Sequence, residues 1–183
     1  MVKLLSMLER KKTIDLIQQY FLVSHDLNLK KISNTISSEA IMSNNRDLMY
    51  FSYFPYMLYK IMTQPHIIHS PRWDKSKKTI LAYFDTLEKR NLDEYPKEIN
   101  YFISLFRIEN KDLYYYFKNI LEKSKVKKAS DCYEHGITIN KAVELTGAER
   151  VEVVRYLGNS KINYDIGKDV IDSKVKIIEE FFM

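Results

Sequence analysis

Eight side chains in the C-terminal third of the sequence carry groups of the kind that contact DNA. Lysine and arginine bind phosphate oxygens, and arginine and asparagine also hydrogen-bond to the edges of bases. We expect Arg150 and Arg155 to enter a DNA groove, and the lysines of residues 123–128 to contact the phosphate backbone. The full set of predicted DNA-binding residues is Lys123, Lys125, Lys127, Lys128, Arg150, Arg155, Asn159 and Lys161.

Patterns typical of metal sites and catalytic pairs are weak. His66 and His69 have a spacing that metal ligands use, but Pro65 disfavours a helix there and no third ligand is evident. Cys132 and His135 stand three positions apart on one predicted helix. We interpret them as a semi-buried cysteine beside a solvated histidine, rather than as a nucleophile and its base.

The distribution of glycine excludes two large classes of nucleotide-binding enzyme. All four glycines lie in the last 48 residues, so the first 135 residues contain no glycine loop that could cradle phosphates. P-loop and Rossmann chemistry are therefore ruled out. We expect a protein that is not an enzyme and that binds no metal, no cofactor and no small-molecule ligand.

The elements that would position the two arginines follow from the pattern of residues 136–158. Gly136 ends an incoming helix, Thr138 caps a short helix, and Gly147 makes a tight turn. Glu149 then begins a second short helix, which a further glycine ends. The apolar positions of the two helices are Ile139, Ala142, Val143, Leu145, Val151, Val153, Val154 and Leu157. Two short helices around such a turn are typical of a helix-turn-helix, whose second helix lies in a DNA major groove.

Residues 131–162 also resemble a known family. An aromatic residue and Gly-Ile precede Lys-Ala-x-Glu-Leu-x-Gly, and Leu-Gly closes the second helix. The matching residues are Tyr133, Gly136, Ile137, Lys141, Ala142, Glu144, Leu145, Gly147, Leu157 and Gly158. The segment resembles the core of UPF0175-type prokaryotic antitoxin proteins, as well as the generic helix-turn-helix pattern. This resemblance covers residues 131–162 of the 183-residue chain and implies a nucleic-acid-binding or regulatory protein.

Two glutamates depart from that pattern. DNA-reading helices often have Ser or Thr after the turn, whereas this sequence has Glu149, followed by Glu152. Carboxylates repel phosphates, and among the bases only the cytosine amino group favours one. The alternative is therefore a helix-turn-helix that serves as a scaffold in an antitoxin-like protein or a subunit of a complex. The residues of the last helix that would then dock a partner are Ile171, Val175, Ile178, Phe181 and Phe182.

The residues that break helices divide the chain into two parts. The glycines all follow residue 135, whereas the four prolines all precede residue 100. We predict an all-α protein with a helical region over residues 1–130 and a helix-turn-helix-like module with a C-terminal helix over residues 131–183. The first region is expected to serve dimerisation or to bind a protein partner.

Helical spacing of apolar residues places several elements in the first region. A helix over residues 4–21 is predicted to be interrupted by an exposed turn at residues 10–12, where three cations break the apolar stripe. A second helix is predicted to open at Ser38 and to be kinked or divided by Pro55. Asn110 is predicted to cap a helix that runs to about His135.

A second group of cations surrounds the single tryptophan. Residues 63–74 are predicted to form a loop, and Asp74 is predicted to cap the helix that follows. The cations near Trp73 are Arg72, Lys75, Lys77 and Lys78. They form either a solvated helix face or a surface that contacts phosphate.

Charge and hydropathy set the remaining expectations. The formal net charge of +5 permits attraction to nucleic acid without requiring it. Residues 1–135 carry 22 Lys and Arg against 16 Asp and Glu, whereas residues 136–183 carry 7 against 8. The most apolar stretch, residues 50–59, contains a proline and is too short for a membrane span. We therefore expect a cytoplasmic protein that does not bind membranes.

Overall fold

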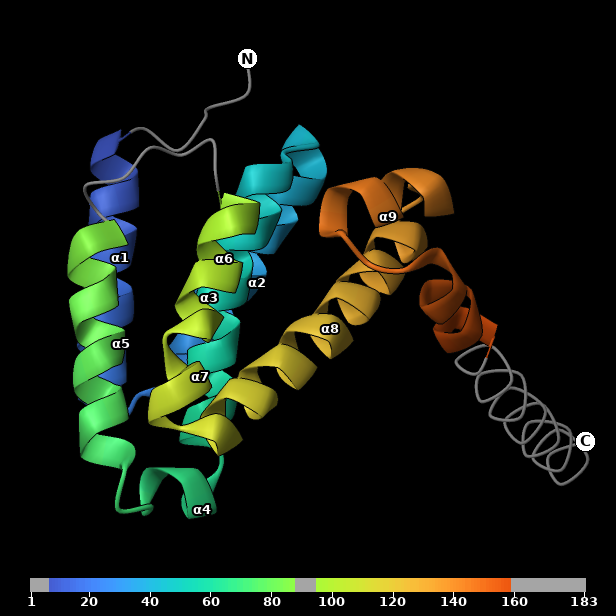
Figure 1. Cartoon of the computed structure of the whole chain (residues 1–183). Helices are drawn as coiled ribbons and strands as arrows, with labels where there is room; N and C mark the ends of the chain where they lie inside the picture. The colour runs from blue at the N-terminus through green and yellow to red at the C-terminus, as the bar shows by residue number, and fades with distance from the viewer. Residues whose placement is uncertain (1–6, 88–94, 159–183) are drawn as a thin grey trace, which may run out of the picture. The chain divides into compact units, whose positions relative to one another are not determined.

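The computed structural model describes residues 7–87 and 95–158, and every regular element in these two stretches is a helix (Figure 1). The helices are α1 (Met7–Leu22), α2 (Asp26–Ser43), α3 (Arg46–Met62), α4 (Pro65–Ile68), α5 (Trp73–Leu87), α6 (Tyr95–Ser104), α7 (Phe106–Glu109), α8 (Lys111–Glu134) and α9 (Ile139–Thr146). Residues 150–158 are also helical. The predicted all-α class is confirmed for this part of the chain. None of the helices described has the length and apolar composition needed to span a bilayer.

The chain divides into two compact units, Met1–Lys125 and Val126–Met183. Helix α8 begins in the first unit and ends in the second. The roles predicted for residues 1–130 and 131–183 stay predictions.

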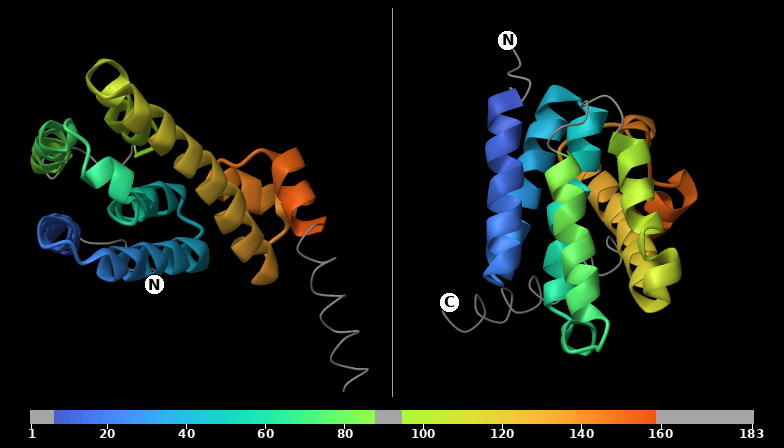
Figure 2. Two further views of the ribbon diagram at one scale, coloured as in Figure 1. Left: turned by 90° about the horizontal axis from the view of Figure 1, so that it is seen from below. Right: turned by 60° about the vertical axis from the view of Figure 1, so that its left-hand side comes forward.

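Helix α3 lies at the centre of the first unit, and α1, α2 and α6 pack against it (Figure 2). Of its 17 residues, 11 are buried, so the helix is enclosed on nearly every side. Its N-terminus is capped by Asn45, whose side chain accepts a hydrogen bond from the backbone N–H of Leu48 at 3.0 Å. Pro55 lies inside α3, which runs through it without being divided.

An aromatic cluster joins α3 to three other helices of the first unit. The ring of Phe54 on α3 lies 5.9 Å from that of Phe84 on α5 and 5.6 Å from that of Phe102 on α6. The ring of Phe102 lies in turn 5.2 Å from that of Phe117 on α8. These three pairs meet edge to face, the arrangement that the aromatic quadrupole favours. Contacts between residues distant in sequence therefore hold this unit together.

Two of the predicted helix boundaries in the first unit are wrong. Helix α1 continues through residues 10–12, and the side chain of Arg10 is only 4% exposed instead of lying in an exposed turn. Helix α2 begins at Asp26, well before Ser38. It ends at Ser43, and the C-cap Asn44 has a φ of 49°, the left-handed conformation that often follows a helix.

The predicted loop over residues 63–74 contains one turn of helix. Pro65 occupies the first position of α4, where its missing N–H costs no intrahelical hydrogen bond. Helix α5 begins at Trp73, so Asp74 lies in its first turn and is not its cap. The predicted cap of α8 is confirmed, because Asn110 Oδ1 accepts a hydrogen bond from the N–H of Leu113 at 3.2 Å.

Candidate nucleic-acid interface

Both ends of α9 are stabilised by the residues that the sequence analysis assigned to them. The side chain of Thr138 accepts a hydrogen bond from the N–H of Lys141 at 3.4 Å. Gly147 has a φ of 70° and donates its N–H to the carbonyl of Val143 at 2.8 Å. An L side chain is disfavoured at this φ, so glycine suits the position. Gly136 lies between α8 and α9 and has a φ of 84°.

The turn between α9 and residues 150–158 depends on a side chain that the sequence analysis did not single out. The buried hydroxyl of Thr146 donates to the carbonyl of Ala142 at 2.7 Å and accepts from the N–H of Ala148 at 3.3 Å. The carbonyl of Glu149 then accepts from the N–H of Val153 at 3.1 Å, which starts the next helix. The sequence does place this threonine directly before the glycine that ends a predicted helix, and that position could have indicated its role in the turn.

The two helices have buried apolar residues on one side only. The buried side chains are Ala142, Leu145, Ala148, Val153 and Leu157, each no more than 7% exposed. Val151 and Val154 are 67% and 48% exposed. The valines of residues 150–158 therefore divide between the interior and the surface.

The exposed side of residues 150–158 has both charged and apolar groups. Arg150 is exposed, and none of the ion pairs in the described part of this unit involves it. Arg155 is also exposed, and its Nη1 lies 2.5 Å from Oε1 of Glu152, one turn away. Residues 126–158 contain five Lys or Arg and five Asp or Glu. Positive and negative residues therefore balance over this stretch, and any basic patch is confined to single positions such as that of Arg150.

The four lysines predicted to contact phosphates have different environments. Lys123 and Lys127 are exposed on α8. The ammonium of Lys125 lies 2.8 Å from the carboxylate of Glu122, and the lysine side chain is 13% exposed. Lys128 is only 7% exposed, and burial lowers its pKa from 10.5 to about 8. The expectation of a surface role for Lys128 is therefore corrected, because its amine is packed inside the protein.

Several predicted residues lie outside the described part of the chain. They are Asn159, Lys161, Ile171, Val175, Ile178, Phe181 and Phe182.

Cys132 and His135 lie close to the end of α8 and differ in exposure. Cys132 is fully buried, and burial raises the pKa of its thiol to about 11. The ring of His135 lies within hydrogen-bonding distance of the carbonyl oxygen of Asp131, with Nδ1 at 2.7 Å. Among the residues described, no three His, Cys, Asp or Glu side chains gather as a metal site would require.

Neither protein-family models nor curated proteins nor solved structures include a match to this chain.

Proposed function

We propose that the protein binds DNA through its second unit and acts as a regulatory factor, with residues 150–158 as the recognition helix of a helix-turn-helix. One observation carries the proposal. Val153 and Leu157 of this helix are buried, while Arg150 and Val151 on the same helix are exposed. A recognition helix needs this division, because one side must be fixed while the other reaches base edges.

The exposed groups suit the chemistry of the major groove. An arginine can donate two hydrogen bonds to guanine, and the methyl groups of a valine can contact the methyl group of thymine. Arg150 and Val151 follow the turn directly, at the N-terminal end of the helix, which is the end that approaches bases in helix-turn-helix proteins. Arg155 must give up its pairing with Glu152 to contact a phosphate, so we assign it a smaller contribution.

The binding experiment is a titration of a fluorescent mixed-sequence DNA duplex, followed by anisotropy at about 50 and about 200 mM salt. We expect binding that weakens with salt. The slope should be shallow because, of the five Lys and Arg in residues 126–158, Lys141 and Arg155 are ion-paired and Lys128 is buried. Arg150→Glu should weaken binding at least tenfold, which corresponds to about 1.4 kcal/mol. The matched control is Arg107→Glu, the same change at an exposed position of α7. Absence of binding at the lower salt, or equal losses in both variants, would refute the proposal.

A second candidate function is a protein interaction through the same helix. Val151, Val154 and Tyr156 are 67%, 48% and 42% exposed, and exposed apolar side chains on one short helix favour a protein partner. In this case a stoichiometric partner should co-purify with the native protein. Aspartate at Val151 and Val154 should release that partner, whereas Arg150→Glu should retain it.

A further inference from the structure

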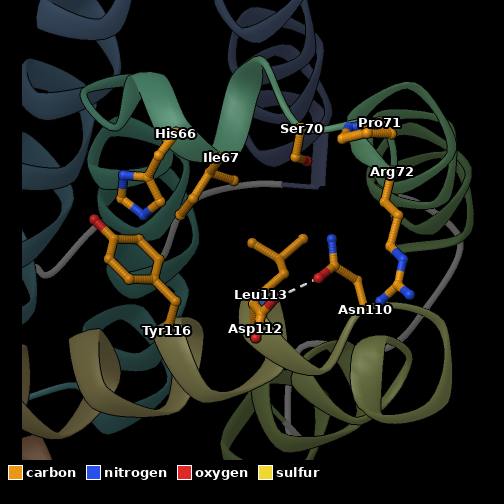
Figure 3. Close-up of a pocket in the computed structure, with 9 residues that line it drawn as sticks. All are labelled: His66, Ile67, Ser70, Pro71, Arg72, Asn110, Asp112, Leu113 and Tyr116. Carbon is orange, nitrogen blue, oxygen red and sulfur yellow. Dashed lines mark hydrogen bonds between the residues drawn. The ribbon is translucent and has the colours of Figure 1, made fainter.

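A cavity of about 510 Å³ lies within the first unit, between the α4–α5 connection and the start of α8 (Figure 3). Its volume is within the range of natural small-molecule sites, about 300–1,000 Å³. A ligand of this kind was not expected from the sequence, because the residues that line the cavity come from segments distant in sequence. Its chemistry is independent of the DNA-binding proposal.

The apolar walls and one end of the cavity are suited to an apolar or planar group. Ile67 from α4 and Leu113 from α8 lie on opposite sides of the cavity (Figure 3), and they are 8% and 1% exposed. His66 and Tyr116 line one end (Figure 3). The hydroxyl of Tyr116 donates to the carbonyl of Lys60 at 3.1 Å, which fixes the position of the phenol ring. A ligand ring would therefore meet two ring side chains and two apolar walls.

The opposite end of the cavity is polar and preorganised. Arg72 and Asn110 line it, and the Arg72 side chain extends toward the end at which Asn110 lies (Figure 3). Asn110 is 5% exposed, and its amide is held in place by donating to Ser76 Oγ at 3.2 Å. Ser70 also lines the cavity, and its buried hydroxyl has no hydrogen-bond partner. A buried hydroxyl without a partner is uncommon in native proteins and is available to a ligand.

Electrostatics at the polar end favours an anion. Helices α5 and α8 begin at Trp73 and Lys111, next to the lining residues Arg72 and Asn110. The first turn of each helix carries a partial positive charge, and Arg72 adds a full charge. Asp112 is the one carboxylate in the lining, and its place in the first turn of α8 is where a helix favours a negative side chain.

From this arrangement we propose that the first unit binds a small organic anion that has a planar ring and a carboxylate or phosphate group. The ring lies between Ile67 and Leu113, beside Tyr116. The anionic group accepts hydrogen bonds from Arg72 and from the hydroxyl of Ser70.

Four probes separate the contributions of the ring and the anion. Phenyl phosphate and benzoate have both groups, inorganic phosphate has only the anion, and benzyl alcohol has only the ring. Dissociation constants are measured by NMR with the full-length protein. We expect the tighter of phenyl phosphate and benzoate to bind at least tenfold more tightly than either single-group probe, and the tighter one identifies the anionic group. If inorganic phosphate binds equally well, or if no probe binds at millimolar concentration, the proposal is overturned.

Variants at exposed positions locate the binding without disturbing the fold. Arg72→Ala should weaken phenyl phosphate binding about tenfold and leave benzyl alcohol unchanged, since about 1.4 kcal/mol of anion binding is lost. His66→Ala should weaken binding of all three ring-bearing probes and leave inorganic phosphate binding unchanged. The matched controls are Lys78→Ala on α5 and His69→Ala, which are exposed and do not line the cavity. Equal effects of a variant and its control would show nonspecific binding and contradict the proposed site.

Discussion

The guanidinium of Arg10 donates a hydrogen bond to the carbonyl oxygen of Leu87 across 2.5 Å, and so joins α1 to the last residue of α5. The same group lies 5.6 Å from the ring centroid of Tyr95 on α6. Carbonyls in the last turn of a helix have no intrahelical donor, and a buried cation satisfies one of them here. A residue whose charge suggested an exposed turn therefore connects three helices.

Replacement of Arg10 by alanine should destabilise the first unit by about 2 kcal/mol, the usual magnitude for a hydrogen bond from a charged group. The control is Lys12→Ala, which removes an exposed cation from the same helix and should change stability little. Urea denaturation followed by Trp73 fluorescence measures both variants, because Trp73 belongs to this unit. Equal midpoints for the two variants would show that the contact between Arg10 and Leu87 contributes nothing.

Two glycines of the second unit should respond differently to alanine. Gly147→Ala should cost about 1 kcal/mol, because an L residue is strained at a φ of 70°. Gly158→Ala should be neutral or stabilising, because Gly158 is helical and a Cβ there meets nothing within 4 Å. Hydrogen exchange of the α9 amides measures both effects. Faster exchange in Gly158→Ala than in Gly147→Ala would contradict this assignment.

The buried amine of Lys128 should make the stability of the second unit rise with pH. The unfolded chain keeps the ammonium proton up to the ordinary pKa of 10.5, whereas in the folded state burial lowers the pKa to about 8. Between these values the unfolded state binds more protons, so the free energy of unfolding increases with pH. Cys132 has the opposite effect above pH 9. Its pKa is raised from 9.0 to about 11 in the folded state, so the thiol ionises first in the unfolded chain and the free energy of unfolding falls with pH.

The effect of Lys128 is isolated by comparing Lys128→Met with its parent in a Cys132→Ala background. At pH 7 the methionine variant should be more stable by up to about 3 kcal/mol, since it avoids burying a charge. This advantage should shrink as the pH rises above 8 and be lost only above pH 10.5, where the unfolded chain also loses the proton. Hydrogen exchange of α9 at several pH values gives the difference. A constant difference across the series would mean that Lys128 keeps an ordinary pKa in the folded protein.

Cys132 should react slowly with thiol reagents in the native protein. A rise in pKa from 9.0 to about 11 lowers the thiolate fraction about 100-fold at pH 8, and full burial blocks access as well. The reaction with dithiobis(nitrobenzoate) should therefore be at least 100-fold slower in buffer than in urea. Comparable rates in the two conditions would place the thiol on the surface.

Local signals in the sequence were sufficient for part of the fold. The caps at Asn110 and Thr138 and the turn at Gly147 were predicted correctly, because each depends on one residue and its near neighbours. The start of α2 was not predicted, because His25 makes no side-chain cap hydrogen bond at that end. The burial of Arg10 depends on Leu87, a partner that no local pattern reveals.

The candidate sites also divide into features that local sequence predicts and features that depend on distant residues. Exposure of Arg150 and Arg155 agrees with the surface position expected for them, whereas spacing alone did not separate buried Lys128 from exposed Lys127. The cavity in the first unit was not predicted at all. It requires Arg72 and Asn110 to come together, although they are 38 positions apart and belong to different helical connections.

The enclosed position of α3 has a consequence for synthesis of the chain. Its residue Phe54 packs against Phe102, which the ribosome adds 48 residues later. Because synthesis adds about 5–20 residues per second, several seconds pass between the synthesis of α3 and that of its partners in α5 and α6. The nascent chain therefore passes through an interval in which its most apolar helix is a target for chaperones, and slow codons between residues 62 and 102 would prolong it.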